Sequence, residues 1–329
     1  TGAHGSVASS LLFIPDISGF TEFVNRTEVV HSQHIIAELL ELIIDTDRLG
    51  LTLSEIEGDA VLFYKEGFVP PLAAVVNQAR EIFEAFHARL KDFESRRICD
   101  CGACHTAHTL SLKVVAHAGP IEFLNVKRFK KPFGPDVILA HRLLKNDLDT
   151  HEYLLVTESM LASLGVEAGR AILAGPDLDW ADWSGGTSDY EEFGAIPYRY
   201  LPLGPLLTRI PDPPPPPAVP RSENPIVQEI LVNRPLPELF ELVSNLDLRL
   251  IWNSSVDELR YEANRINRVG TKHHCVIGGD LIEFETVSED FGDGRIAYGE
   301  RLLAPPLVAD CSAFYVLEPE GESTRLRME

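Results

Sequence analysis

The chain has 329 residues, of which 45% are hydrophobic, and a formal net charge of -21 at pH 7. This length and apolar content suit a globular protein with two domains of ordinary size. The strongly negative charge argues against sequence-independent nucleic-acid binding and against docking on anionic lipid. No apolar run is long enough to span a bilayer, and the crowding of three cysteines into residues 99–104 is not a secreted disulfide pattern. We therefore expect a cytoplasmic protein with no membrane span and no nucleic-acid partner.

The first part of the chain alternates short apolar runs with amphipathic stretches of helical period. The turn Glu57-Gly58-Asp59 between two such runs predicts a hairpin. The predicted elements are a strand over 11–14, a helix over 34–44, a hairpin of 52–56 and 60–64, a helix over 73–93, a second hairpin of 110–116 and 121–126, and a helix over 137–144. Strands and helices in this order indicate an α+β sheet domain, which we assign to residues 9–207.

Two segments interrupt this regular pattern. The acidic stretch 175–193 contains Trp180 and Trp183, and we expect an irregular surface excursion there. The tract Pro211–Pro220 is rich in proline, cannot donate most of its backbone hydrogen bonds and favours an extended, semi-rigid conformation. We therefore predict a linker over residues 208–222 and a second domain over residues 223–329.

The second domain begins with a strand and helices and continues as a series of strands. The predicted elements are a strand over 226–232, helices over 236–250, and strands over 259–263, 272–277, 280–288, 295–302 and 312–318. With the segments 226–235 and 246–253, this order resembles the START-like, polyketide-cyclase-like superfamily, whose helix-grip sheet curls around a cavity. The resemblance implies an apolar small molecule or lipid as ligand. Members of that superfamily usually carry a closing C-terminal helix, which this sequence lacks, so we expect an open grip.

Three residues of this second domain are candidates to line the cavity, namely Trp252, His274 and Cys275. Strand alternation alone does not say which face points inward, and core packing is the alternative for each.

Two stretches of the first domain, Phe13–Thr21 (FIPDISGFT) and Ile56–Ala60 (IEGDA), resemble signatures of class III nucleotidyl cyclases. The resemblance implies a ferredoxin-like cyclase domain with a metal site at Asp16, Ile17 and Asp59. Carboxylates suit Mg²⁺ or Mn²⁺, and two such ions polarise an attacking hydroxyl and neutralise phosphate charge. The structural alternative is that Asp16 caps a helix and Asp59 fills a turn.

The resemblance also implies a site for a nucleoside triphosphate, ATP or GTP. We expect a helix to open within residues 17–21, so that its free backbone amides favour phosphate. Glu55 falls where the family reads the purine and taken alone favours guanine; the equal alternative is an exposed polar residue on a strand. Lys131 at the second such position does not complete a guanine pattern. The nucleotide-binding residues are then Ser18, Gly19, Phe20, Thr21, Glu55 and Lys131.

The catalytic helix of the family carries an asparagine and, four residues later, an arginine. Arg142 matches the arginine, whereas Ile138 stands where the asparagine belongs and cannot orient a ribose. Loss of such a polar group commonly lowers a rate by about 10²–10³. Because family active sites lie between two cyclase domains, the resemblance implies a homodimer in which Arg142 comes from the other subunit.

A cysteine cluster follows the long predicted helix, at Cys99, Cys101 and Cys104, with His105 beside it. Three thiolates and one imidazole complete a tetrahedral zinc site. We favour a metal or redox role over the alternative, a loop with reduced thiols.

Three functions follow from these patterns. The favoured one is a divalent-metal-dependent, nucleotide-binding signalling protein of cyclase fold that is catalytically weak or degenerate and is coupled to the ligand-binding second domain. The alternatives are an active adenylyl or guanylyl cyclase and a non-catalytic scaffold that binds a ligand and dimerises.

Overall fold

The computed structural model describes residues 8–166, 182–216, 219, 222–288, 295–304 and 310–329. The chain divides into two compact units, and each is described by itself below. The first unit comprises residues 1–25, 36–90 and 108–212, and the second comprises residues 26–35, 91–107 and 213–329. Among the described residues, none of the helices has the length and apolar character needed to cross a membrane.

A mixed seven-stranded sheet forms the centre of the first unit, in the order β2-β3-β1-β4-β7-β9-β8. All neighbouring strands are antiparallel except β4 and β7, which are parallel. The strands are β1 (Ser10–Ser18), β2 (Thr52–Glu57), β3 (Ala60–Lys65), β4 (Ser111–Gly119), β7 (Tyr153–Thr157), β8 (Ser184–Tyr190) and β9 (Gly194–Pro202). The whole of β1 is buried, which is expected of a central strand with both faces covered.

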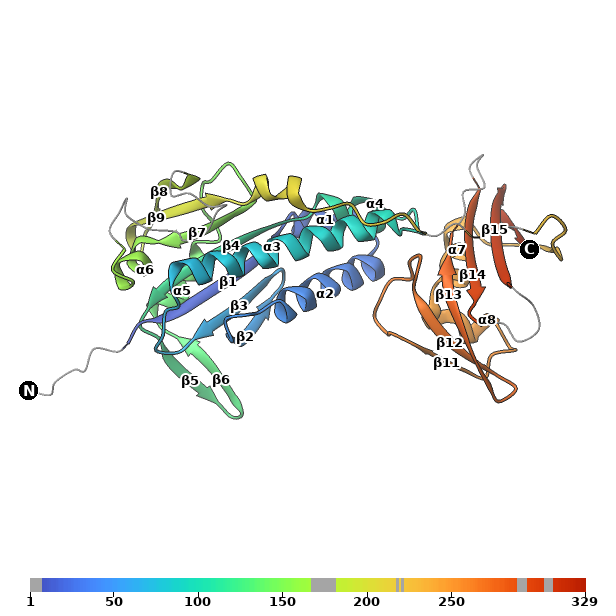
Figure 1. Cartoon of the computed structure of the whole chain (residues 1–329), viewed down its shortest axis with the longest axis horizontal. Coiled ribbons are helices and arrows are strands. Elements are labelled where there is room, and N and C mark those ends of the chain that lie inside the picture. Colours follow the sequence, from blue (N-terminus) through green and yellow to red (C-terminus); the bar gives the residue numbers. More distant parts are fainter. Residues whose placement is uncertain (1–7, 167–181, 217–218, 220–221, 289–294, 305–309) are drawn as a thin grey trace, which may run out of the picture. The chain divides into compact units, whose positions relative to one another are not determined.

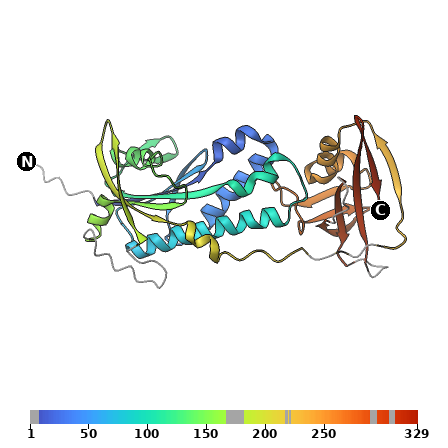
Figure 2. The ribbon, with the colours of Figure 1, turned by 90° about the horizontal axis from the view of Figure 1, so that it is seen from above.

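Helices cover both faces of this sheet (Figures 1 and 2). On one face, Val137 and Ala140 of α5 (Pro135–Arg142) pack against Leu12 and Ile14 of β1. On the other face lies α3 (Leu72–Ser95), with α2 (Val29–Asp45) beside it (Figure 2). Among the described residues before the linker, the other helices are α1 (Phe20–Arg26), α4 (Gly102–Thr106), η1 (Ala107–Thr109), α6 (Glu158–Ser163) and η3 (Gly204–Arg209).

The predicted hairpin of residues 52–64 is confirmed as β2 and β3, but the second predicted hairpin is wrong. The central strand β4 is bonded on its two edges to β1 and β7, so it has no free edge for residues 121–126. Those residues form β5 (Glu122–Val126), which pairs instead with β6 (Phe129–Phe133) in a separate two-stranded ribbon. The ribbon is mostly exposed, whereas β4 is mostly buried.

The expected irregular excursion at 175–193 is also wrong where it is described. Residues 184–190 form β8, which pairs with β9, and Trp183 is buried; Trp180 lies outside the described residues. Two glycines hide this strand from sequence patterns, because glycine weakens the strand signal. At Gly186 a Cβ atom would lie 2.5 Å from the ring of Tyr198, so a side chain there would collide with the cross-strand neighbour.

The second unit contains an antiparallel seven-stranded sheet in the order β10-β16-β15-β14-β13-β12-β11. Its strands are β10 (Gln228–Val232), β11 (Glu258–Tyr261), β12 (Lys272–Ile277), β13 (Asp280–Val287), β14 (Ile296–Leu302), β15 (Ser312–Glu320) and β16 (Ser323–Met328). The predicted helical segment is broken into α7 (Leu236–Ser244), η4 (Leu246–Leu248) and α8 (Arg249–Trp252). The break falls at Asn245, whose side chain accepts a hydrogen bond from the amide of Asp247.

One face of this sheet holds a buried polar network. Arg249 of α8 donates to Glu300 and to the Tyr298 hydroxyl, and His273 lies 3.4 Å from Glu300. These side chains are almost completely buried. The strong field of Arg249 holds the pKa of Glu300 below its usual range even though burial alone would raise it.

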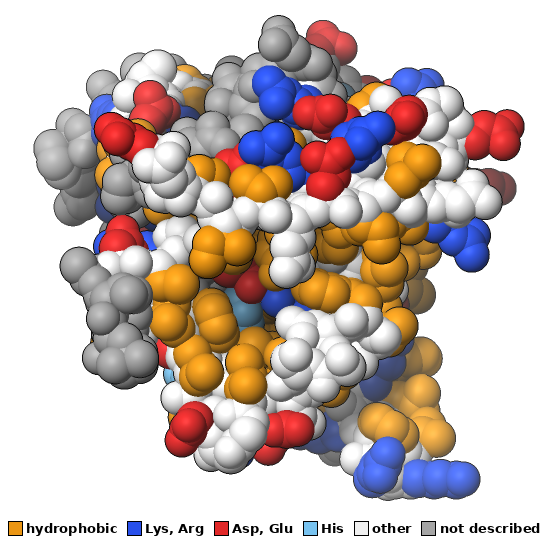
Figure 3. Space-filling model, turned by 90° about the vertical axis from the view of Figure 1, so that its right-hand side faces the viewer, with side chains coloured by type: hydrophobic (Ala, Val, Ile, Leu, Met, Phe, Trp, Pro, Cys, Tyr) orange, Lys and Arg blue, Asp and Glu red, His pale blue; other side chains and the backbone are white. Residues whose placement is uncertain are grey.

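The candidate cavity residues divide between the two faces of β12. Cys275 is buried and lies on the same face of β12 as His273. His274 points to the opposite face and is only half-buried. Trp252 packs edge-on against Tyr315, at a ring separation of 5.8 Å. On the face of the molecule seen in Figure 3, apolar side chains surround a hollow in which acidic, basic and histidine side chains are visible.

Candidate functional site

The two predicted metal carboxylates lie at one end of the central strand of the first unit. Asp16 follows Ile14 by two residues, so strand alternation puts it on the face that carries α5. Asp59 follows the hairpin turn at Gly58, where φ is +65°, and its carbonyl accepts a hydrogen bond of 3.0 Å from the amide of Ile17. The hairpin is thereby held against β1, and the two carboxylates come together.

A cleft of about 570 Å³ opens beside this pair. Its lining brings together residues of β1, the hairpin, β4 and α5, and these are Asp16, Thr21, Glu57, Asp59, Ala60, Lys113, Ile138, His141, Arg142, Leu144 and Lys145. The three α5 residues Ile138, His141 and Arg142 are spaced three and four residues apart, so they are neighbours on the helix surface and line the cleft together. One chain therefore contributes both the Asp pair and Arg142 to the same cleft.

The Asp pair brings two carboxylates together in a partly buried place, where their negative charges repel each other. Burial and the neighbouring charge of Asp16 raise the pKa of Asp59 to about 6. Asp16 is 6% exposed and is partly neutralised by Lys113, whose Nζ lies 3.0 Å from its Oδ2. Two adjacent carboxylates with one compensating amine form a site that favours additional positive charge.

Lys113 is a residue of the cleft that the sequence did not predict. It lies directly opposite Asp16 in the antiparallel pairing of β4 with β1, so the two side chains share one face. A signal was present, because a lone lysine in the apolar run Leu112–Ala116 needs an anionic partner when buried. Only the strand register identifies that partner as Asp16.

The predicted phosphate-binding helix begins only towards the end of residues 17–21. Ile17 and Ser18 still belong to β1, and both are buried. The chain turns at Gly19, where φ is +87°, and α1 begins at Phe20. Within residues 17–21, only Thr21 lines the cleft.

The two predicted purine-reading residues pair with each other. Lys131 Nζ lies 2.6 Å from Glu55 Oε2, and this contact raises the pKa of Lys131. Neither residue lines the cleft, although Glu57, which does line it, lies 3.8 Å from Lys131. In this arrangement the two side chains neutralise each other's charge, and neither faces the cleft.

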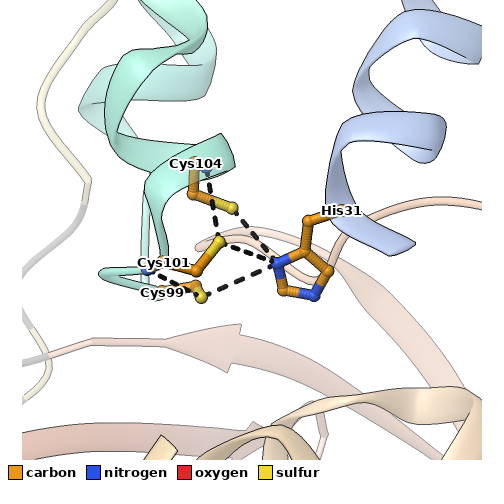
Figure 4. Close-up of side chains that lie close together, drawn as sticks. All are labelled: His31, Cys99, Cys101 and Cys104. Carbon is orange, nitrogen blue, oxygen red and sulfur yellow. Dashed lines mark hydrogen bonds between the residues drawn. The ribbon is translucent and has the colours of Figure 1, made fainter. Parts of the chain in front are cut away.

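The predicted cysteine cluster comes together, but with a different histidine. Figure 4 shows the three sulfur atoms directed at Nδ1 of His31, at 3.7 Å from Cys99, 3.2 Å from Cys101 and 3.5 Å from Cys104. The choice of His105 as fourth ligand is wrong, since that exposed residue is not among the four clustered groups. His31 was missed because it lies 68 residues before Cys99, where no local spacing connects them.

These observations define an α/β protein with a mixed sheet, a carboxylate-lined cleft and a separate cysteine–histidine cluster. Residues 36–153 match a family described as a protein of unknown function, DUF2652. The chain is 33% identical over 167 residues to the uncharacterized protein Rv2561/Rv2562 of Mycobacterium tuberculosis, covering 51% of this chain and 73% of the relative. The chain belongs to the family of that mycobacterial protein.

Solved structures that resemble the chain include nucleotidyl cyclase domains. The guanylate cyclase domain of RhGC from Catenaria anguillulae, in complex with GTP, is 18% identical, with a TM-score of 0.40 over 60% of this chain and 97% of that chain. A bacterial light-regulated adenylyl cyclase is 14% identical, with a TM-score of 0.41 over 62% of this chain and 96% of that chain.

Proposed function

We propose that the first unit binds a nucleoside triphosphate together with divalent ions in the cleft and converts it to a cyclic product slowly or not at all. The observation that carries this proposal is the shared cleft of the Asp16–Asp59 pair and Arg142. Carboxylates supply the hard oxygen ligands that Mg²⁺ and Mn²⁺ prefer. Ions held there would bridge the protein to the anionic phosphates, which the negative chain would otherwise repel.

Positive side chains on the opposite wall support a phosphate ligand. Arg142 and Lys145 line the same cleft as the two carboxylates. The side chain of Arg142 is 52% exposed, and its guanidinium lies 3.7 Å from the carboxylate of Glu192. Such a loose surface pair costs little to open, so the guanidinium is available to a phosphate oxygen.

Weak turnover is proposed because of Ile138. This side chain is 53% exposed and lines the cleft one helical turn before Arg142. An aliphatic group there offers no hydrogen bond to a ribose hydroxyl, so the reacting oxygen is poorly oriented. Glu55 and Lys131 are the residues proposed to distinguish ATP from GTP. Their mutual ion pair would have to break before either side chain could contact a base.

We propose that the second unit is START-like and binds an apolar small molecule. Binding of this ligand would regulate the first unit. The strand–helix–meander order and the hollow in Figure 3 support this proposal. The cleft differs from the expected division of the site between two subunits, because Arg142 lines it together with the Asp pair of its own chain. Homodimer formation, which the cyclase resemblance implies, is therefore a separate proposal that the cleft does not require. The competing function is a scaffold, in which the cleft binds no nucleotide.

Calorimetric titration of the purified chain with ATP and with GTP, in Mn²⁺, tests the proposal. We expect Asp16→Asn and Asp59→Asn each to weaken binding by roughly tenfold or more, since each removes a metal ligand. Asp189→Asn, an exposed carboxylate of β8 outside the cleft, is the matched control. Absence of nucleotide binding by the wild-type chain, or equal losses in the control, would favour the scaffold.

Asp59→Asn should also change the pH dependence of stability. The folded pKa of about 6 lies above the ordinary value of 3.8, so ionisation of Asp59 opposes folding as the pH rises through this interval. In metal-free buffer at pH 8 we expect Asp59→Asn to melt at a higher temperature than wild type. Below about pH 4 the two should converge, because the wild-type carboxyl is then protonated. A melting temperature that falls at pH 8 would contradict the repulsion within the carboxylate pair.

A further inference from the structure

The cluster of His31, Cys99, Cys101 and Cys104 has no role in the proposed nucleotide site. All four residues belong to the second unit, whereas the cleft is built from the first. One ligand atom from each residue lies within 4.8 Å of all the others. Cys99, Cys104 and His31 are buried, and none of the cysteines forms a disulfide.

The distances match those around one tetrahedral zinc ion. Zinc lies about 2.3 Å from thiolate sulfur and about 2.0 Å from imidazole nitrogen, so at the tetrahedral angle a sulfur and a nitrogen are roughly 3.5 Å apart. The three observed separations from His31 Nδ1, 3.2, 3.5 and 3.7 Å, lie around that value. A simple hydrogen-bonded histidine would not need three sulfurs directed at the same nitrogen.

The backbone around the cysteines is already shaped for thiolate ligands. The amide of Cys101 donates to Cys99 Sγ, and the amide of Cys104 donates to Cys101 Sγ, both at 3.4 Å. Such donors stabilise negative charge on sulfur. Glu28 also accepts a hydrogen bond of 3.1 Å from the amide of Ala103, which holds the start of α2 beside the cysteine loop.

His31 is oriented from its other side by a carboxylate. Its Nε2 lies 3.1 Å from Glu241 Oε2, and Glu241 in turn accepts a hydrogen bond from the side chain of Asn245. A proton on Nε2 leaves the lone pair of Nδ1 directed at the sulfurs. This carboxylate–histidine arrangement is the usual support of a metal-bound imidazole.

We propose that His31, Cys99, Cys101 and Cys104 bind one structural zinc ion. Three thiolates and an imidazole in a tetrahedron select zinc over the hard ions Mg²⁺ and Ca²⁺. Four protein ligands leave no open coordination position, so the ion has a structural rather than a catalytic role. It joins the first turn of α2 to the end of the loop after α3 and to α4, segments far apart in sequence, and stabilises the second unit.

Zinc content of the purified full-length chain, measured by elemental mass spectrometry, tests this site. We expect one zinc per wild-type chain and nearly complete loss in His31→Ala, with a lower melting temperature. His105→Ala is the matched control and should retain its zinc. His31→Cys should also retain zinc, because a fourth thiolate completes the tetrahedron; this variant separates lost ligation from failed folding.

Several results would overturn the site. A wild-type chain without zinc after growth in zinc-supplemented medium is one, and equal zinc loss in His31→Ala and His105→Ala is another. An intact mass two hydrogens lower under non-reducing conditions, removed by reduction, would identify a disulfide within the cluster instead. Nucleotide titrations of wild type and of Asp59→Asn measure a different property, the affinity of the cleft. A chain without zinc could therefore still bind nucleotide, and the proposed cleft function would stand.

Discussion

Replacing Ile138 by asparagine is expected to increase cyclic nucleotide formation by about 10²–10³-fold, the usual effect of one preorganised polar group on a rate. The site tolerates the change because Ile138 is 53% exposed and does not belong to the core. The new amide would line the cleft on the same helix face as Arg142, where it can orient a ribose hydroxyl. Product formation from ATP and from GTP with Mn²⁺ is the measurement.

Two companion variants make this result specific. Ile138→Val keeps the apolar character and should leave the low rate unchanged. Ile138→Asn combined with Asp59→Asn should be inactive, because the metal ligand is lost. An unchanged rate in Ile138→Asn, with nucleotide still bound, would show that ribose orientation is not what limits turnover and would favour a nucleotide sensor.

Replacing Arg249 by methionine is expected to destabilise the second unit by about 3–5 kcal/mol, the usual cost of removing one partner from a buried ion pair. Arg249 and Glu300 are 1% and 4% exposed, and Arg249 donates to Glu300 Oε2 at 2.9 Å. Without the guanidinium, the Glu300 carboxylate stays buried beside Tyr298 and His273 but has lost its cationic partner. The local measurement is the rate of amide hydrogen exchange in β14 and β15, which reports how often these strands open.

The double variant Arg249→Met with Glu300→Leu decides whether charge is the cause. Removing both charges should recover most of the lost stability, because no unpaired ion remains. Arg325→Met is the matched control, since Arg325 pairs with Glu229 and Glu320 on the surface and should have little effect. A double variant no more stable than Arg249→Met would mean that the arginine contributes by packing, for example against the ring of Trp252.

Local patterns predicted elements that are formed by residues close together in the sequence. The long helix at 73–93 and the hairpin at 52–64 are confirmed as α3 and the β2–β3 pair. Both depend on interactions between residues near in sequence, where helical period and a Gly-containing turn are reliable signals. The two failures have different causes. Both edges of β4 are already paired, so β5 pairs with β6 instead, and two glycines weaken the strand signal of β8, which pairs with β9.

For the candidate sites too, some residues were found from the sequence and others only from the structure. The sequence by itself determined that Asp16 and Asp59 belong together, through two signature stretches, and that three cysteines form one group. Only the tertiary structure decided their partners: strand register brings Lys113 to Asp16, and helix packing brings His31 rather than His105 to the cysteines. Partners far apart in the chain are selected by packing and register, which no local spacing encodes.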